Sequence, residues 1–348
     1  MVRTRIARDG PVPWSVVVDA ALYGPGGLYT GDRGAGRGRD FLTSPELGPL
    51  FGAVVARYLD DAWERLGRPN PFDVVEAGAG SGALAGAVVH ARLACGAALR
   101  YTAVEVSPVL RAGAAARLGP SVTVTAELAV SRVTGVVLAN ELLDNLAFDV
   151  YARGVTGWRE VRVGLAEGSP AQGALVEVEV AARPSVERTL STLAAEAPAG
   201  ARVPWQVGGA RWLRRALAVL ERGEVTVVDY ARSTAEMAAV GPAGWLRTYR
   251  RGGRGASPLQ TLGAQDITAD VAADQLALVR PPVRTEAQGA WLDRHGMAQL
   301  EVAAAATWRE RAAIGDLVAL RARSRAGEAA ALRDPAGLGA FTVMTWEV

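Results

Sequence analysis

Short valine-rich runs alternate along this chain with longer stretches rich in alanine and leucine. In order they are "FDVVEAG", residues 84–99, "YTAVEVS", residues 108–118, "VTVTA" and "GVVLANE". Apolar runs without a strict polar alternation are typical of parallel strands that are buried on both faces, and the stretches between them predict covering helices. The sequence therefore predicts an α/β fold, a Rossmann-like sheet with helices on both faces.

Further segments extend this prediction towards the C-terminus. The run "EVTVVDY" is expected as a fifth strand after a helix over 209–222, and "GAFTVMTWEV" as a last strand at an edge of the sheet. Two alternating runs in "WREVRVGLAEGSPAQGALVEVEV" predict a hairpin, followed by a helix. The segment "RTYRRGGRGASPLQTLGAQDI" is polar and rich in glycine and arginine, which favours a mobile loop or lid.

We expect these pieces to form a single catalytic domain over 1–348. Its predicted parts are an N-terminal helical segment covering the cofactor (1–70), the first half of the core (71–150), an inserted hairpin and helix (151–205), and the second half of the core (206–348) with a lid at about 241–270.

Composition argues against several classes of function. The net charge is only +2, none of the 38 basic residues is lysine, and the arginines are scattered, so charge gives no support for nucleic-acid binding. Cys95 is the single cysteine and the chain has two histidines, which argues against a disulfide framework, a cysteine- or histidine-based metal centre and a serine–histidine–acid triad. We expect no metal. No stretch approaches the roughly 18 apolar residues of a membrane span, and the first residues lack the apolar core of a signal peptide. We expect a cytoplasmic protein, and its oligomeric state is not predicted.

The run "DVVEAGAGSGALAG" contains the first candidate site. Gly78, Gly80 and Ala83 match the dinucleotide pattern G-x-G-x-x-G/A, and Glu105 ends the next strand, where a ribose-binding acid belongs. A triphosphate loop is excluded because no G-K-[ST] follows. Glu76 precedes the first glycine, where its charge would repel a pyrophosphate but suits the ammonium and sulfonium groups of S-adenosyl-L-methionine (SAM). The alternatives are a tight turn without a ligand for the glycines and a solvated strand end for Glu105.

The run "EAGAGSG", which ends at Gly82, is followed by an acid on the second strand. This combination resembles motif I of class I methyltransferases. A more specific resemblance covers the chain from about residue 20 onward. The segments that carry it are "ALYGPGGLYTGDRGAGRGRDFLTSPELGPLFGAVVARYL", "VVEAGAGSGAL", "YTAVEVSPVLR", "LANELLDNLAFDVY", "WREVRV", "VVDY", "LRTYRR", "SPLQTLGAQDITADV" and "DPAGLGAFTVM". Together they resemble the MidA family of SAM-dependent methyltransferases, which includes a protein-arginine methyltransferase.

Asn140, Glu141 and Asp144 directly follow the fourth predicted strand, at the carboxyl edge where open parallel sheets bind ligands. On a helix beginning at Glu141, the i to i+3 spacing would place the two carboxylates on one side. There they could hold a guanidinium by charged hydrogen bonds, orient its lone pair and accept its proton. We assign catalysis to Glu141 and Asp144, and cofactor binding to Asn140. The alternative is that Asp144 or Asn140 merely caps the helix.

The resemblance implies further site residues. Phe41, Thr43 and Ser44 are expected to close over the cofactor, and Asp229 with Tyr230 to flank the substrate opening. The chain also departs from the family pattern. Asn145 and Ala147 stand where the family has alanine and proline, Ala231 where it has glycine, and Gly252 where it has histidine.

The leading hypothesis is a protein methyltransferase acting on arginine. The alternatives are a small-molecule N- or O-methyltransferase and a SAM-binding assembly or scaffolding protein without turnover. The arginine-rich residues 247–254 argue against a cationic arginine substrate approaching by that side and favour an acidic region elsewhere on the partner. The alternative is that they are simply a solvated loop.

Overall fold

The computed structural model describes residues 1–30, 43–128, 132–166, 173–250 and 253–348. The chain divides into two compact units, each assembled from separate segments. Unit 1 comprises Met1–Asp40, Leu142–Arg215 and Tyr230–Pro281, and unit 2 comprises Phe41–Glu141, Ala216–Asp229 and Pro282–Val348. The units thus combine distant parts of the sequence, unlike the contiguous segments expected above. The covering role of residues 1–70 stays a prediction.

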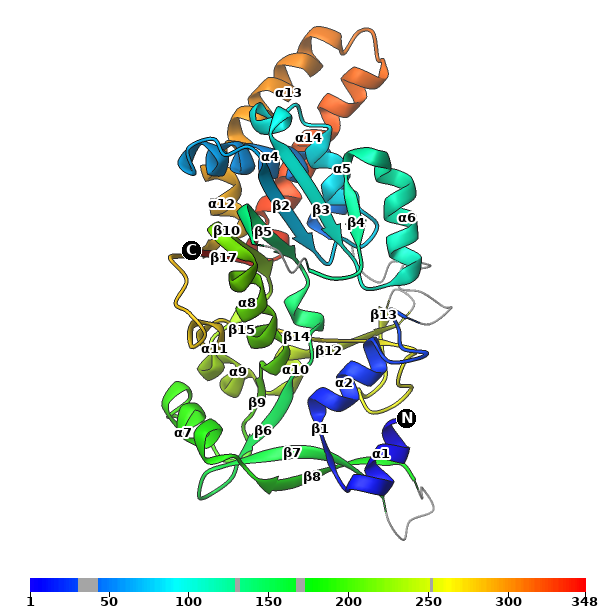
Figure 1. The fold of residues 1–348 in the computed structure, drawn as a ribbon, viewed down its shortest axis with the longest axis vertical. Coiled ribbons are helices and arrows are strands. Elements are labelled where there is room, and N and C mark those ends of the chain that lie inside the picture. Colours follow the sequence, from blue (N-terminus) through cyan, green and yellow to red (C-terminus); the bar gives the residue numbers. More distant parts are fainter. Residues whose placement is uncertain (31–42, 129–131, 167–172, 251–252) are drawn as a thin grey trace. The chain divides into compact units, whose positions relative to one another are not determined.

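Unit 2 contains a seven-stranded sheet in the order β16-β17-β10-β5-β2-β3-β4 (Figure 1). The strands are β2 (Phe72–Ala77), β3 (Leu99–Val104), β4 (Thr123–Thr125), β5 (Val133–Asn140), β10 (Leu220–Asp229), β16 (Arg284–Ala287) and β17 (Thr342–Glu347). The five strands from β10 to β4 are parallel, as predicted, and β17 is antiparallel to β10. The prediction that β17 lies at the edge is wrong, because β16 pairs with its other side. β16 is short and polar, so the sequence contains no apolar run that would predict this strand.

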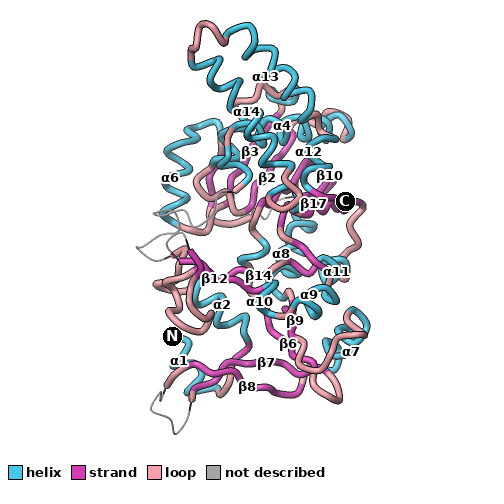
Figure 2. Tube along the Cα trace, turned by 180° about the vertical axis from the view of Figure 1, so that it is seen from behind, coloured by secondary structure: helices cyan, strands magenta, loops and turns pink. Residues whose placement is uncertain are grey.

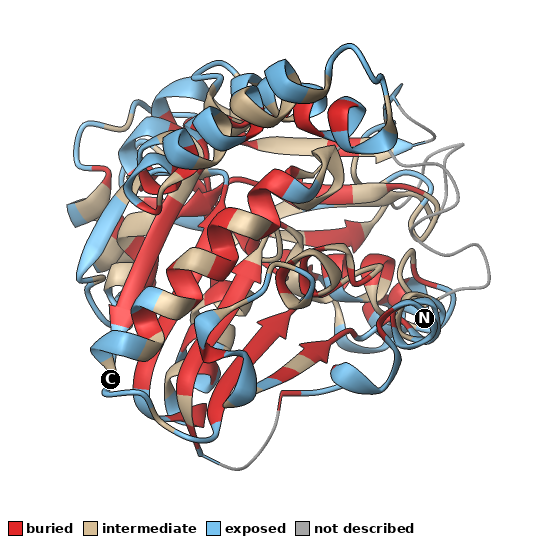
Figure 3. Cartoon of the chain, turned by 90° about the horizontal axis from the view of Figure 1, so that it is seen from above, coloured by how far each residue is buried: buried red, intermediate tan, exposed pale blue. Residues whose placement is uncertain are grey.

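The parallel strands of unit 2 are covered on both faces. All six residues of β2 are buried, and Figure 3 shows strands in the buried colour along much of their length. Side chains of α4 (Pro49–Arg65) and α5 (Ala83–Val89) join one core with residues such as Phe72, Val74 and Leu138. The two helices lie in contact, because a Cβ on Gly52 would stand 2.3 Å from that of Ala87.

The helices of unit 2 match the sequence where local signals are strong. The predicted helix over 108–118 is confirmed as α6 (Pro108–Leu118), which Ser107 caps by accepting a hydrogen bond from the amide of Leu110. The single helix expected over 84–99 is wrong, since α5 ends at Val89 and only the 3-10 turn η1 (Ala94–Ala97) follows. Arg92, between them, has a left-handed φ of 51°. The helix before β10 is α8 (Val207–Val219), which ends earlier than predicted.

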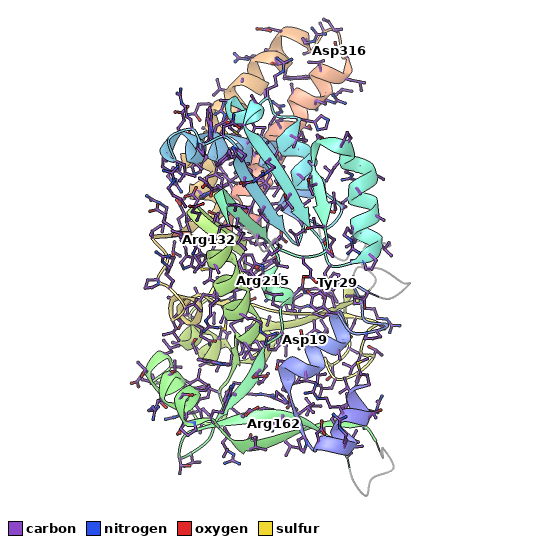
Figure 4. The ribbon with its side chains drawn as sticks, in the orientation of Figure 1. Asp19, Tyr29, Arg132, Arg162, Arg215 and Asp316 are labelled. Atoms are coloured by element: carbon purple, nitrogen blue, oxygen red, sulfur yellow. The ribbon has the colours of Figure 1, made fainter. Side chains whose placement is uncertain are left out.

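The C-terminal part of unit 2 adds α12 (Gln288–Arg294), the 3-10 turn η4 (Leu338–Ala340) and a pair of helices. Figure 2 shows this pair, α13 (Met297–Arg311) and α14 (Leu317–Arg333), side by side. Asp316, labelled in Figure 4, caps α14 by accepting a hydrogen bond from the amide of Ala319. No helix in the described ranges is long and apolar enough to cross a membrane.

Unit 1 is built around a five-stranded sheet. Its strands are β1 (Val12–Pro13), β6 (Asp149–Arg153), β7 (Trp158–Leu165), β8 (Leu175–Ala181) and β9 (Arg202–Trp205). The predicted hairpin is confirmed as the antiparallel pair β7–β8, and the predicted helix after it is α7 (Pro184–Leu193). The core centres on Phe148, whose ring stacks on Trp14 at 6.4 Å and meets Trp245 edge-on at 6.2 Å. The remaining helices are α1 (Val2–Asp9), α2 (Trp14–Leu22), α9 (Thr234–Val240), α10 (Pro242–Trp245) and α11 (Ala273–Ala277).

The segment expected as a mobile loop forms a three-stranded antiparallel sheet instead. It consists of β13 (Gly253–Arg254), β12 (Leu246–Arg250) and β14 (Asp266–Ala269), in that order. Gln265 is 1% exposed, and its side chain binds the backbone of Ala256, Ser257 and Gln260 at 2.9 Å. The interpretation as a loop is therefore wrong for the three strands, whereas residues 255–265, which connect β13 to β14, contain no helix or strand. The predicted mobility and lid role stay predictions.

Candidate functional site

The three glycines of the turn after β2 share a left-handed backbone, and two of them differ in what surrounds them. Gly78, Gly80 and Gly82 all have positive φ, at 73°, 54° and 73°, a conformation that other residues adopt at a cost. A Cβ on Gly82 would lie 2.9 Å from the side chain of Leu118 on α6, so this glycine allows α5 and α6 to pack closely. A Cβ on Gly80 would meet no described atom within 4 Å. The turn therefore has open space beside Gly80, where a ligand can approach the backbone.

Glu105 lies directly after β3 and is tied to this turn. Its Oε2 accepts a hydrogen bond from the amide of Gly80 at 2.8 Å, and its Oε1 accepts one from the amide of Ser107 at 2.7 Å. The residue is 5% exposed, and burial raises the pKa of its carboxyl group. The alternative of a solvated strand end is therefore wrong. The structure brings Glu105 and the glycine turn together as predicted, and the contact to a ribose stays a prediction.

Glu76 lies deeper than its predicted role implies. It is 4% exposed, and its Oε2 accepts a hydrogen bond from the Tyr101 hydroxyl at 2.8 Å. Burial, the largest effect, raises the pKa of Glu76 to about 7, although the Tyr101 hydroxyl and the nearby backbone amide of Ala85 act in the opposite direction. The direct contact of Glu76 to a cofactor stays a prediction, and Tyr101 is a residue that sequence reasoning missed.

Three predicted residues meet beyond the carboxyl end of β5. Oε1 of Glu141 accepts hydrogen bonds from the Asn140 side-chain amide at 3.1 Å and from the backbone amide of Ser44 at 3.2 Å. Ser44 is fully buried, and its hydroxyl donates to Oε1 of Gln288 at 3.2 Å. Gln288 was missed, because nothing in its local sequence relates it to Ser44, 244 positions away. Oδ1 of Asn140 is buried and accepts no hydrogen bond from any group in the described chain.

Glu141 has an unusual backbone. Its φ is 51°, a left-handed value that is uncommon for a residue with a side chain, while its amide still donates to the carbonyl of Val228 at 2.8 Å. Strain of this kind persists only where surrounding contacts fix it, and it concentrates at functional sites. The carboxylate is thus fixed at the edge of the sheet by its neighbours.

The helix that was predicted to begin at Glu141 does not form. Glu141 is left-handed, and only the 3-10 turn η3 (Leu143–Asn145) follows. Leu142 is the residue before this turn, and no side chain caps it, so the capping alternative is wrong as well. Glu141 belongs to unit 2 and Asp144 to unit 1. The pairing of their carboxylates stays a prediction, without the α-helical spacing that suggested it.

The segment before α4 is anchored from α14. Glu328 accepts a hydrogen bond from the amide of Leu50 at 3.0 Å, and a Cβ on Gly48 would stand 2.3 Å from its carboxyl carbon. These contacts lie next to the short helix α3 (Ser44–Leu47). Thr43 directly precedes α3, and its carbonyl accepts a hydrogen bond from the amide of Glu46. The cofactor roles of Thr43 and Ser44 stay predictions, and Phe41 lies outside the described residues.

The two residues that were expected to flank the substrate opening differ in exposure. Asp229 ends β10 opposite Thr342 and is fully buried, whereas Tyr230 is 37% exposed. The Arg247 guanidinium lies 5.3 Å from the centre of the Tyr230 ring and pairs with the buried Asp270. The ring of Tyr230 therefore already binds a cation. The substrate roles of both residues stay predictions.

The departures from the family pattern are accommodated locally. The Asn145 side-chain amide donates to Oδ1 of Asp266 at 3.0 Å, and its carbonyl oxygen accepts from the Tyr29 hydroxyl at 3.2 Å. The carbonyl of Ala147 accepts from the amide of Gly208 at 2.7 Å. Ala231 starts β11 (Ala231–Arg232), which pairs with β15 (Val271–Ala272), and its φ is not positive, so glycine is not required. Gly252 lies outside the described residues.

Comparison with known proteins gives a consistent family. Residues 54–283 match a family model described as S-adenosyl-L-methionine-dependent methyltransferase. A crystal structure from Burkholderia thailandensis, titled as a candidate methyl transferase bound to S-adenosyl-homocysteine, superposes with a TM-score of 0.82 at 26% identity over 100% of this chain and 90% of that one. A native structure of a superfamily member from the same organism gives the same TM-score at 28% identity, with the same coverage.

Curated relatives match over shorter stretches. The mitochondrial protein arginine methyltransferase NDUFAF7 homolog of Drosophila melanogaster is 37% identical over 33% of this chain and 27% of its own length. The mitochondrial protein arginine methyltransferase NDUFAF7 of Danio rerio is 27% identical over 48% of this chain and 46% of its own length. The matches therefore span less than half the length of these curated relatives.

Proposed function

Since the chain belongs to the MidA family of SAM-dependent methyltransferases, we propose that it transfers the methyl group of SAM to an arginine of a protein partner. Methyl transfer from SAM is the activity of the family, and the arginine acceptor is the proposal. The name of the curated relatives supports it, and so does the chemistry of the carboxylate at Glu141. The predicted cytoplasmic location is kept as part of the proposal.

The observation that carries the proposal is the fixed carboxylate of Glu141. It lies directly after β5 on a left-handed backbone, and Asn140 and Ser44 both donate hydrogen bonds to the same oxygen. Two donors on one oxygen set the direction of the carboxylate. A carboxylate with a set direction suits a planar guanidinium, which binds carboxylates through charged hydrogen bonds.

The described residues fit SAM as the cofactor. The space beside Gly80 admits a ligand to the backbone, Glu105 is held at that turn, and the buried Oδ1 of Asn140 can accept a hydrogen bond from a donor outside the chain. These residues would hold the nucleoside and the amino-acid part of the cofactor. When bound, SAM supplies an electrophilic methyl carbon attached to a sulfonium.

The chain's own contribution is to orient the acceptor and to manage one proton. The Glu141 carboxylate would accept hydrogen bonds from N–H groups of the guanidinium and so orient its nitrogens. It would also take up the proton that the methylated nitrogen loses. Asp144 is proposed as the second acid, from its place in the family pattern.

The test of the acceptor is incubation of the protein with radiolabelled SAM and host cell lysate, followed by hydrolysis of the labelled protein. We expect label in methylarginine. Label in small molecules alone would replace the proposal with a small-molecule methyltransferase, and tight SAM binding without any transfer would replace it with a scaffolding protein.

The test of the cofactor site is calorimetry with SAM, S-adenosylhomocysteine and NAD. We expect the first two to bind, and Glu105→Ala to weaken both about tenfold to a hundredfold, the effect of one charged hydrogen bond. Unchanged affinity in Glu105→Ala would remove this residue from the cofactor site.

A further inference from the structure

The small sheet of unit 1 carries a row of three side chains that no proposed role yet uses. Tyr249 on β12 pairs with Arg254 on β13 and with Asp266 on β14. Laterally paired residues point to the same face of a sheet, so the three side chains stand side by side. Thr248 and its partner Ile267 point to the other face and are buried. One face of the sheet is thus core, and the other presents a cation, an aromatic ring and an acid.

This row stands on a fixed backbone. On the strand-to-strand connection beneath it, the Gln265 amide bonds to Ala256, Ser257 and Gln260, and the Thr248 hydroxyl donates to the carbonyl of Ala256 at 2.7 Å. Side-chain hydrogen bonds from Thr248 and Gln265 therefore tie this connection to the strands on either side of it.

The ring of Tyr249 already binds a guanidinium. The Cζ atom of Arg254 lies 5.3 Å from the ring centre, within the range of a cation–π contact. Arg254 is exposed, so little buried surface is lost if another guanidinium takes its place. Asp266, on the other side of Tyr249, supplies the negative charge that a bare aromatic ring lacks. An aromatic face beside a carboxylate suits a guanidinium better than an ammonium, because a guanidinium both stacks and donates in a plane.

Asp266 is held in place by residues from two other segments. Its Oδ1 accepts hydrogen bonds from the Asn145 amide at 3.0 Å and from the backbone amide of Ile267 at 2.9 Å. The hydroxyl of Tyr29, a residue labelled in Figure 4, lies 3.4 Å from Oδ2. These donors fix the direction of the carboxylate.

We propose that Tyr249 and Asp266 form a guanidinium-binding subsite of unit 1, in which Arg254 occupies the place of an arginine of the protein substrate. The inference rests on the proposed function, which requires a substrate that carries guanidinium groups. The neighbouring Arg247 is paired with Asp270, and Arg250 points to the opposite face. Arg254, which lies over the Tyr249 ring, is one charge that competes with an incoming guanidinium.

The experiment is a titration of the full chain with N-acetyl-arginine amide at low ionic strength, followed by NMR. We expect Arg254→Ala to tighten binding about twofold to fivefold, the size of an exposed cation–π contact. Tyr249→Leu should weaken binding by a similar factor, and Asp266→Asn, which keeps the shape of the side chain, about tenfold. The uncharged analogue N-acetyl-citrulline amide should not bind.

The matched control is Arg250→Ala, which removes the same charge from the other face of the same small sheet, on β12. We expect it to leave the affinity unchanged. If Arg250→Ala and Arg254→Ala tightened binding of the ligand equally, net charge alone would explain the change in affinity, and the subsite would be overturned. Full affinity in both Tyr249→Leu and Asp266→Asn would also overturn it, provided that their melting temperatures match the parent protein.

Failure of the subsite and failure of the proposed function give different results. If the titrations follow the expected order while no arginine is ever labelled by SAM, the subsite stands and the acceptor assignment fails. If the Tyr249→Leu and Asp266→Asn variants methylate arginine with the KM and kcat of the parent protein, the acceptor assignment stands and the subsite fails.

Discussion

Four acids of the two units differ in how much they depend on backbone donors. In unit 2, backbone amides bind Glu105 and Glu141, and the Asn140 side chain also donates to Glu141. In unit 1, the side chains of Asn145, Arg232 and Arg247 hold Asp266 and Asp270, and one backbone amide also donates to Asp266. A backbone donor stays when the residue that carries it is substituted, whereas a side-chain donor is lost. Single substitutions of neighbouring side chains should therefore affect Asp266 and Asp270 more than Glu105 and Glu141.

The largest effect should come from Glu141→Gln in unit 2. Glutamine keeps the size of the side chain but cannot take up a proton, so we expect methyl transfer to fall by about a hundredfold or more, with SAM affinity changed only a few-fold. The measurement is labelled-methyl transfer and SAM calorimetry on the same preparation.

Glu141→Gly is the matched control. It relieves the left-handed backbone, whose φ is 51°, and also removes the carboxylate. Activity in this variant would show that the backbone turn matters and the acid does not, and full activity in both variants would remove Glu141 from the catalytic residues.

A second prediction concerns the pH dependence of unit 2. Burial raises the pKa of Glu76 to about 7 in the folded protein, from an ordinary value of 4.5. Below pH 4.5 both states carry the proton. Between pH 4.5 and 7 the unfolded chain releases it and the folded chain keeps it, so the free energy of unfolding falls by about 3 kcal/mol over this window and then levels off.

Urea unfolding of the parent protein and of Glu76→Gln between pH 4.5 and 8 isolates this contribution, because all other groups are common to both. The difference in stability should move in favour of the glutamine variant as pH rises. A difference that does not change with pH would show that Glu76 titrates normally.

The glycine turn offers a paired test within the same unit. In Gly82→Ala, the alanine adopts an unfavourable positive φ and its methyl group collides with the side chain of Leu118. We therefore expect a loss of about 2–4 kcal/mol in stability. Gly80→Ala meets only the backbone cost, about 1–2 kcal/mol, but its methyl group enters the open space beside the turn. SAM affinity should therefore fall about tenfold in Gly80→Ala and change less in Gly82→Ala. If calorimetry showed a larger loss of SAM affinity in Gly82→Ala than in Gly80→Ala, the cofactor would not lie beside Gly80.

The smallest effect should come from unit 1. Asn145→Ala restores the family's residue and removes the hydrogen bonds to Asp266 and Tyr29, at a cost of about 1 kcal/mol in stability. SAM affinity should be unchanged, whereas the ranking of arginine peptides as acceptors should shift by a few-fold. Competition assays with mixed peptides measure the shift. If Asn145→Ala lost as much SAM affinity as Glu105→Ala, the distinction between the acids of unit 2 and those of unit 1 would fail.

The sequence predicted those features that depend on neighbours along the chain. The helix α6 follows from the cap at Ser107 and a proline at its start, and the parallel strands follow from their apolar runs. The left-handed Glu141 leaves no local sign, because contacts from Ser44 and β10 fix it. The bond between Asn145 and Asp266 joins residues 121 positions apart, and neither residue type predicts it. The positions of Glu105 and Glu141 directly after their strands were thus predictable, and the side chains that hold them were not.

The place of β17 also bears on how the protein is made. This strand lies between β16 and β10, yet it is the last strand in the chain. A ribosome delivers β10 long before β17, so during synthesis β10 presents an open edge of unpaired backbone groups, which is a template for pairing with other chains. The sheet of unit 2 can close only when residue 347 has emerged. Nascent chains stalled before that point should therefore aggregate more readily than the finished protein.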